Sequence, residues 1–280
     1  MSRGFFYVSG ILRFVMRYQV ILFILLLIFF SGCRRSADNT MKPKHQESVS
    51  GFSGGSIGSR ALVPAVVADS DNLLMNPGFE SGLRGWHWLD WSKGWSAFSL
   101  SQEFSYEGMH SLHLPVRSEG DRRSTVVWGG VQELELSEDI PECLDGYFYI
   151  NNWKRGAWKQ YLQVVVIDLS QSLGENAGMP QLRYLVTGEV RPPLSIGNAQ
   201  YIFEPNHLTE SPVMGEWLYL QFNPRRDFQE MWGYVPGSGH KLRVLFEARF
   251  DERRGGDAYA DVYYDHLYFG PRKSGHCSVH

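Results

Sequence analysis

The feature that most constrains this sequence is a series of strand-length runs in which apolar and polar residues alternate. These runs occur at 111–116, 131–136, 147–151, 161–167, 217–222, 242–250 and 260–269, and each is bounded by Gly, Pro, Asn or Asp. No window of about 12 or more residues shows the 3.6-residue stripe of an amphipathic helix. Many strands without helices between them predict an all-β fold, an antiparallel β-sandwich.

The composition agrees with a β-rich chain. The 280 residues include 9 Trp, 14 Tyr, 17 Phe and 29 Gly, and aromatic residues favour strands whereas Gly favours turns. The formal net charge is -3. Because a nucleic-acid-binding protein needs a clustered basic face, we predict no nucleic-acid partner.

The first segment has the pattern of an export signal. Residues 1–18 carry Arg3, Arg13 and Arg17 and no acid, and an apolar run of about 11 residues follows at 20–30. This run is shorter than the roughly 20 residues that a membrane-spanning helix needs. Residues 1–32 are therefore expected to be a signal peptide, and an uncleaved signal anchor is the alternative.

Directly after the apolar run, Ser31, Gly32 and Cys33 resemble the lipobox of bacterial lipoproteins, with Phe30 where that family prefers Leu. The resemblance implies cleavage before Cys33, a lipid on Cys33, and an exported chain anchored to a lipid bilayer. Arg34 follows, where an Asp tends to retain lipoproteins in the inner membrane. The outer membrane or the cell surface is therefore the expected location.

Changes in composition and in periodicity mark the expected domain boundaries. Residues 33–70 are rich in Gly and Ser and lack periodicity, which predicts a lipidated N-terminus followed by a flexible tether. One β-sandwich is expected over 71–271, with a C-terminal tail at 272–280. The polar, Pro-containing stretch 174–212 is expected to be a long loop inserted between strands.

Three stretches of the expected sandwich form a recognisable set. They read NLLMNPGFESGLRGW at 72–86, SYEGMHSL at 105–112 and VYYDHLYF at 262–269. They resemble the first strand and turn, a strand entry and the closing strand of carbohydrate-binding modules with the galactose-binding-like jelly roll, which accompany xylanases and cellulases. The resemblance implies a jelly-roll β-sandwich that binds a polysaccharide or other glycan. A glycan-active enzyme, or a structural or adhesion domain without sugar binding, is the alternative.

Two groups of residues are candidate glycan-binding sites, because sugars stack their apolar faces on aromatic rings. The first is a run with four Trp in ten residues at 86–95, which predicts an exposed patch at Trp88, Trp91 and Trp95. A Trp-rich cap buried under a loop is the alternative.

The second group lies on the strands expected around 147–153 and 242–250, on the side opposite their alternating apolar residues. The resemblance implies that both strands belong to the ligand-facing sheet. A solvated sheet face without a ligand is the alternative. The outward residues expected to bind the glycan are Tyr147, Tyr149, Asn151, Trp153, Arg243 and Glu247.

The resemblance also implies one structural Ca²⁺ ion between the first and last strands, with Glu80 and Asp265 at the matching positions. Two surface carboxylates without a metal are the alternative. Cys143 and Cys277 remain once Cys33 is lipidated. In an oxidising compartment they can form a disulfide, and two free thiols are the alternative.

Catalytic motifs give little support for an enzyme. The sequence has no phosphate-binding loop and no H-E-x-x-H pattern. Glycosidases need two carboxylates that flank the scissile bond, and no spacing marks such a pair. We therefore expect a non-catalytic, glycan-binding lipoprotein.

Overall fold

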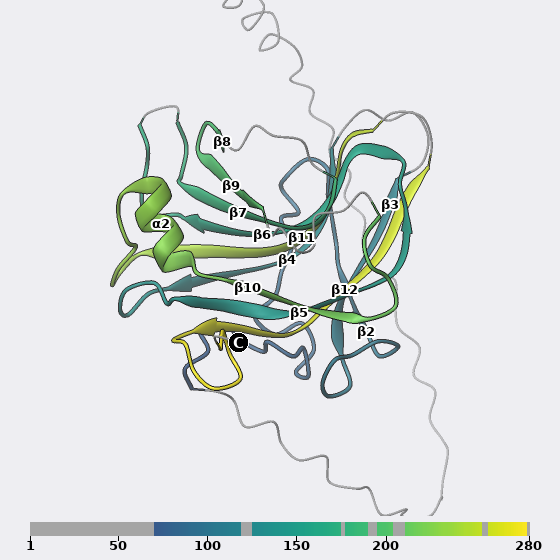
Figure 1. Cartoon of the computed structure of the whole chain (residues 1–280), viewed down its shortest axis with the longest axis horizontal. Helices are drawn as coiled ribbons and strands as arrows, with labels where there is room; N and C mark the ends of the chain where they lie inside the picture. The colour runs from purple at the N-terminus through teal and green to yellow at the C-terminus, as the bar shows by residue number, and fades with distance from the viewer. Residues whose placement is uncertain are drawn as a thin grey trace, which may run out of the picture. The chain divides into compact units, whose positions relative to one another are not determined.

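The computed structural model (Figure 1) describes residues 70–118, 125–174, 177–189, 195–203, 211–253 and 257–278. The chain divides into two units, 1–63 and 64–280, and every described residue belongs to the second. The predicted signal peptide, the lipidation residue Cys33 and nearly all of the predicted tether lie outside the described residues. Of the helices within the described ranges, none has the length and apolar character that a bilayer crossing demands.

The described strands form two stacked sheets (Figure 1). The five-stranded sheet contains, in spatial order, Trp217–Phe222 (β10), Cys143–Lys154 (β5), Ala258–Gly270 (β12), Ser111–Ser118 (β3) and Ser99–Ser101 (β2). The seven-stranded sheet contains Trp95–Ser96 (β1), Val126–Glu135 (β4), Lys241–Arg253 (β11), Ala157–Asp168 (β6), Gln181–Glu189 (β7), Ala199–Phe203 (β9) and Ser195–Ile196 (β8). Successive strands alternate between the sheets from β3 to β6 and from β10 to β12, as in a jelly roll. The predicted all-β sandwich is confirmed.

The main core lies between the two sheets and follows the alternation of the sequence. Along β11, Val244, Phe246 and Ala248 are buried, and along β12, Val262 and Tyr264 join the same cluster. Burying a side chain of this size contributes about 1.5–3 kcal/mol. The alternate residues of the same strands are thereby directed to the two outer faces of the sandwich.

The segment before the first strand is built from turns rather than from the strand that the resemblance implied. Asn76 and Phe79 have left-handed backbones, with φ of 52° and 61°. The Asn76 side chain stabilises this path, because it donates to the carbonyl of Gly82 and accepts from the amide of Ser81. Phe79 and Trp86 nevertheless enter the core, with ring centroids 5.1 Å apart.

The stretch 174–212 is not the loop that its polarity predicted. It contains β7, β8 and β9, which extend the seven-stranded sheet beyond β6. Leu182, Tyr184 and Val186 alternate along β7 and are buried in the main core. The apolar alternation over these few residues is the signal for a strand, and the flanking prolines obscured it.

One short helix, α2 (Pro224–Trp232), lies between β10 and β11. The Asn223 side chain caps it by accepting from the amide of Arg226, Pro224 occupies the first turn, and Gly233 ends it in the left-handed conformation. These end signals were present in the sequence. The helix was not predicted, because nine residues are too few to show a clear helical stripe.

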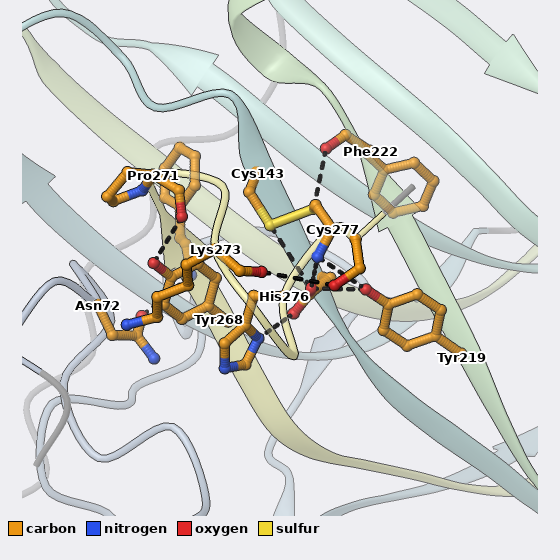
Figure 2. Close-up of a disulfide and its surroundings, with 12 residues drawn as sticks. Asn72, Cys143, Tyr219, Phe222, Tyr268, Pro271, Lys273, His276 and Cys277 are labelled. Carbon is orange, nitrogen blue, oxygen red and sulfur yellow. Dashed lines mark hydrogen bonds and ion pairs between the residues drawn. A yellow bond between two sulfur atoms is a disulfide. The ribbon is translucent and has the colours of Figure 1, made fainter. Parts of the chain in front are cut away.

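Cys143, the first residue of β5, forms a disulfide with Cys277 in the C-terminal tail (Figure 2). The two Cα atoms are 5.7 Å apart. Both cysteines are buried with Tyr268 in a small separate cluster. Of the two alternatives that the sequence left open for these cysteines, the structure contains the disulfide.

Candidate functional site

The outer face of the seven-stranded sheet carries a buried carboxylate. Glu247 points away from the main core, yet it is only 3% exposed. Its neighbours in register are Gly129 on β4 and Gln163 on β6. The Gln163 amide nitrogen donates a hydrogen bond to the Glu247 carboxylate. Because an ionised carboxylate only accepts hydrogen bonds, the Gln163 side-chain oxygen must face elsewhere.

That oxygen, Oε1 of Gln163, is buried and has no hydrogen-bond partner among the residues that the structure describes. Leaving a buried acceptor unpaired costs about 1–3 kcal/mol, so such groups in folded proteins usually have a reason. On the outer surface of a sheet, one reason is a ligand that supplies the missing donor. We call Glu247 and Gln163 the carboxylate–amide pair.

An aromatic ring lies beside this pair because the neighbouring strand has a glycine. A Cβ atom on Gly129 would lie 2.9 Å from the ring of Trp95 and 3.2 Å from Cγ of Glu247. Any larger residue at this position would displace one of them. Gly129 therefore lets the Trp95 ring pack on the sheet next to Glu247.

The rim of this face is formed by the Trp-rich segment 86–95. Trp91 is 72% exposed, and its ring lies 5.9 Å from Cζ of Arg243. Arg243 also donates to Glu133 through Nε at 2.8 Å. Leu89 anchors the segment by packing on Val131, Val165 and Leu245. Trp88 packs edge-on against Phe98, with ring centroids 6.1 Å apart.

Two groups that the sequence treated as separate candidates therefore meet on one face. Arg243 and Glu247 come from the predicted strand group, and Trp91 and Trp95 come from the Trp-rich run. Gln163 was not predicted. Its signal was its place between Leu162 and Val164, which face the core, because that alternation directs the Gln163 side chain outward.

The expectation that the two strand stretches share a sheet was wrong. β5 pairs with β10 and β12, whereas β11 pairs with β4 and β6. Both strands bury one side in the same core, so their outward residues point in opposite directions. Tyr147 and Tyr149 lie on the outer face of the five-stranded sheet, away from Arg243 and Glu247.

Tyr147 and Tyr149 are also covered by the loop between β2 and β3. Tyr106 stacks on Tyr147 with ring centroids 3.6 Å apart, and Phe104 stacks on Tyr149 at 4.7 Å. Burial and the neighbouring Tyr106 hydroxyl raise the pKa of Tyr147 to about 12. One face of each ring is thus already occupied by another aromatic residue.

Trp153 does not face outward as predicted, because β5 has a bulge. Asp261 of β12 pairs with Asn152 and the next residue, Val262, pairs with Ile150, so Asn151 is the extra residue. The bulge reverses the alternation beyond it. Trp153 packs against the main core, and Asn152 instead faces outward and donates to Asp261 at 3.0 Å.

A cavity of about 600 Å³ with both polar and apolar lining residues lies where the turns at 72–84 meet the end of β12. Glu80 and Asp265, the predicted calcium ligands, both line it. Glu80 accepts hydrogen bonds at 2.8 Å from the amides of Met109 and His110. The other residues that line the cavity include Asn72, Asn76, Arg84, Glu107, His266 and His276.

Asp265 is buried in the wall of this cavity. Its carboxylate accepts from the backbone amides of Tyr106 at 2.7 Å, Glu107 at 3.2 Å and His266 at 2.7 Å. Burial, with a smaller effect of the Glu80 charge, raises the pKa of Asp265 to about 7. Ca²⁺ prefers oxygen ligands and neutralises buried carboxylates, so the two acids fit the predicted ion.

Within the described ranges, His, Cys, Asp and Glu ligand atoms gather closely in threes only at Cys143, Asp145 and Cys277. This group is not a metal site, because metals bind thiolates and both sulfur atoms are in the disulfide. Asp145 instead accepts hydrogen bonds from the Tyr219 hydroxyl at 2.6 Å and from the amide of Cys277 at 2.8 Å.

No protein-family model matches this chain, and no curated protein matches it. Solved structures are similar to it at low identity. A carbohydrate-binding module of the β-sandwich superfamily, studied for its promiscuous specificity, is 13% identical with a TM-score of 0.37; the match covers 71% of this chain and 63% of that one. The chain therefore spans less than two thirds of that structure.

Two further structures have similar scores. A CBM28 module specific for non-crystalline cellulose is 15% identical, with 71% of this chain and 97% of that chain covered and a TM-score of 0.39. An endo-β-1,4-glucuronan lyase from the fungus Trichoderma reesei is 12% identical, with 72% and 94% covered and a TM-score of 0.35. Likenesses this distant carry no argument about function, and they include both binding modules and an enzyme.

Proposed function

We propose that this chain is an exported, lipid-anchored protein whose β-sandwich binds a polysaccharide on the outer face of the seven-stranded sheet. The observation that carries the proposal is the carboxylate–amide pair, with its unpartnered Gln163 oxygen, beside Trp95. Export and anchoring are supported by the signal-like segment and by the lipobox-like residues that end at Cys33.

The chemistry of this face suits a sugar. A hydroxyl group can donate to the Gln163 oxygen or to Glu247 and accept from a neighbouring cation, so one sugar ring satisfies several protein groups at once. Trp91 offers an exposed ring on which the apolar side of a sugar can stack. The Arg243 guanidinium stabilises the position of that ring through a cation–π contact.

Affinity electrophoresis of the full-length chain in mild detergent tests this function. Gels containing soluble xylan, hydroxyethyl cellulose, glucomannan or an acidic polysaccharide are compared with gels without polymer. For any polymer that retards the chain, Glu247→Ala is expected to weaken binding at least tenfold, or about 1.4 kcal/mol. Trp91→Ala is expected to weaken it in the same direction.

Glu135→Ala is the matched control, because Glu135 is an exposed carboxylate on β4 of the same sheet. Its binding should equal that of the unchanged chain. Tyr149→Ala tests the opposite face. Retardation that survives Glu247→Ala and Trp91→Ala but is lost in Tyr149→Ala would move the site to the five-stranded sheet. Absence of retardation in every polymer would count against glycan binding itself.

A further inference from the structure

A serine, a histidine and an aspartate form a chain of contacts on the outer face of the five-stranded sheet. Oγ of Ser99 lies 3.2 Å from Nδ1 of His113. Nε2 of the same ring lies 3.3 Å from Oδ1 of Asp261. The three residues come from β2, β3 and β12, which are neighbouring strands of this sheet (Figure 1). Segments that are far apart in the sequence thus supply one continuous set of hydrogen bonds.

The register of the strands brings these side chains to one face. Ser99 pairs directly with His113, and Asp261 pairs with the residue two positions beyond His113 along β3. Leu112 and Leu114 are buried in the main core, so the His113 side chain between them points outward. Direct and diagonal neighbours on one face of a sheet are within reach of each other. The arrangement is therefore held by the sheet and not by a loop.

The other partners of Asp261 keep its carboxylate ionised. Nη2 of Arg117 donates to it at 2.8 Å, and the Asn152 side chain donates at 3.0 Å. Burial acts to raise the pKa of Asp261, but these donors outweigh burial and lower that pKa below its ordinary value. Because an ionised carboxylate only accepts hydrogen bonds, Nε2 of His113 must donate to Asp261.

His113 is therefore placed to act as a base toward Ser99. Burial lowers the pKa of His113 below its ordinary value, although Asp261 opposes this, so the ring is neutral at pH 7. A neutral imidazole has one N–H. With that proton on Nε2, Nδ1 is an acceptor and the Ser99 hydroxyl donates to it. Tyr263 stacks on the His113 ring, with centroids 4.5 Å apart and planes 5° apart, which restricts rotation of the ring.

We infer that Ser99, His113 and Asp261 form a Ser–His–Asp triad that hydrolyses carboxylic esters. A serine is activated as a nucleophile when its hydroxyl donates to a histidine that a third group orients. Here Nδ1 faces the serine and Nε2 faces the carboxylate, the reverse of the usual triad. Either nitrogen of an imidazole can accept a proton, so the reversal preserves the chemistry. Ser99 is exposed on β2, the last described strand of its sheet, so a substrate can reach it from solvent.

The reaction needs only the ester and water. Ser99 Oγ bonds to the carbonyl carbon of the ester, and its proton moves to Nδ1 of His113. The bond from that carbon to the alcohol oxygen breaks, and the alcohol leaves with the proton from Nδ1. Water then attacks the acyl-serine and gives a proton to Nδ1. The bond to Ser99 breaks, Oγ recovers the proton, and a carboxylic acid is released. Asp261 is a positioning residue, because it acts through His113.

Hydrolysis of p-nitrophenyl acetate by the full-length chain in mild detergent tests the inference. Ser99→Ala and His113→Gln are each expected to lower kcat/KM at least about tenfold. Asp261→Asn should lower kcat with little change in KM, a pattern that loss of folded protein alone would not explain, since near-ultraviolet circular dichroism reports the fold. Ser101→Ala is the matched control, because Ser101 lies on the same side of β2 but its hydroxyl accepts from the amide of Glu103.

An alkyl fluorophosphonate gives a second readout, because it bonds to activated serines and loses fluoride. Mass spectrometry of digested protein should locate the label on Ser99 in the unchanged chain and in Ser101→Ala, and not in His113→Gln. A chain without label on Ser99, or ester hydrolysis as fast in Ser99→Ala as in the unchanged chain, would overturn the inference. Neither readout depends on glycan binding, which is proposed for the other sheet.

Discussion

At the scale of single residues, Asp265 is a carboxylate whose buried environment makes ionisation costly. It is fully buried and has three backbone donors, yet its pKa is raised to about 7, chiefly by burial. An unfolded Asp has a pKa near 3.9. The folded state therefore holds a proton on Asp265 between about pH 4 and pH 7, where the unfolded state has lost it.

The difference between the folded-state and unfolded-state pKa of Asp265 decides whether stability rises or falls with pH. Stability falls with pH wherever the folded state binds more protons, so without metal the domain should lose about 2–4 kcal/mol between pH 4 and pH 7. Chemical unfolding in EDTA measures the loss, and Asp265→Asn should flatten the curve. Calcium should restore stability mainly at and above pH 7, by about 2.7 kcal/mol at one hundred times its Kd. Curves that coincide with calcium and with EDTA would refute the calcium site.

At the scale of elements, the alternation of the sequence located the strands but could not assign them to sheets. Each strand buries one side, and the pattern is the same whichever sheet the strand joins. The pattern therefore predicts that Arg243 and Tyr149 share a sheet face, whereas their strands lie in different sheets. The bulge at Asn151 was equally hidden, because one extra residue leaves the composition of a strand unchanged and reverses only the orientation of the residues beyond it.

The reversed orientation of Trp153 gives a direct prediction. Its ring packs on the main core, while its indole N–H is buried and has no hydrogen-bond partner within the described part of the chain. Trp153→Ala should destabilise the domain by about 2–4 kcal/mol, because the ring leaves a cavity. Trp153→Phe should cost less than about 1 kcal/mol, since it removes the unpaired donor along with part of the ring. Urea unfolding measures the free energy of unfolding of both variants. If the Ala variant is as stable as the Phe variant, the Trp153 ring does not pack on the core.

At the scale of the whole domain, one covalent link joins regions that are far apart in sequence. The disulfide between Cys143 and Cys277 spans 134 residues and fixes the C-terminal tail against β5. Such a link stabilises the folded state mainly because it restricts the unfolded chain. Cysteine spacing alone could not distinguish this pair from two thiols, since pairing depends on the fold that brings them together.

Removing the link should be costly but should not change the fold. Cys143→Ser/Cys277→Ser should lower the free energy of unfolding by about 2–4 kcal/mol. Guanidinium unfolding of the oxidised chain and of the double variant measures this difference. Glycan retardation should be unaffected, because the proposed site lies on the other sheet. A variant as stable as the oxidised chain would show that the disulfide contributes nothing to stability.

The two ends of the domain also meet at one place. The Asn72 side chain donates to the carbonyl of Leu267 at 2.9 Å and accepts from the amide of Phe269 at 3.0 Å. The amide of Leu73 donates to the carbonyl of Phe269 at 2.8 Å. Mechanical tension on the chain before residue 70 therefore passes within a few residues to β12, an inner strand of its sheet. The segment that carries Trp91 and Trp95 follows these hydrogen bonds in the sequence, so the tension does not reach it.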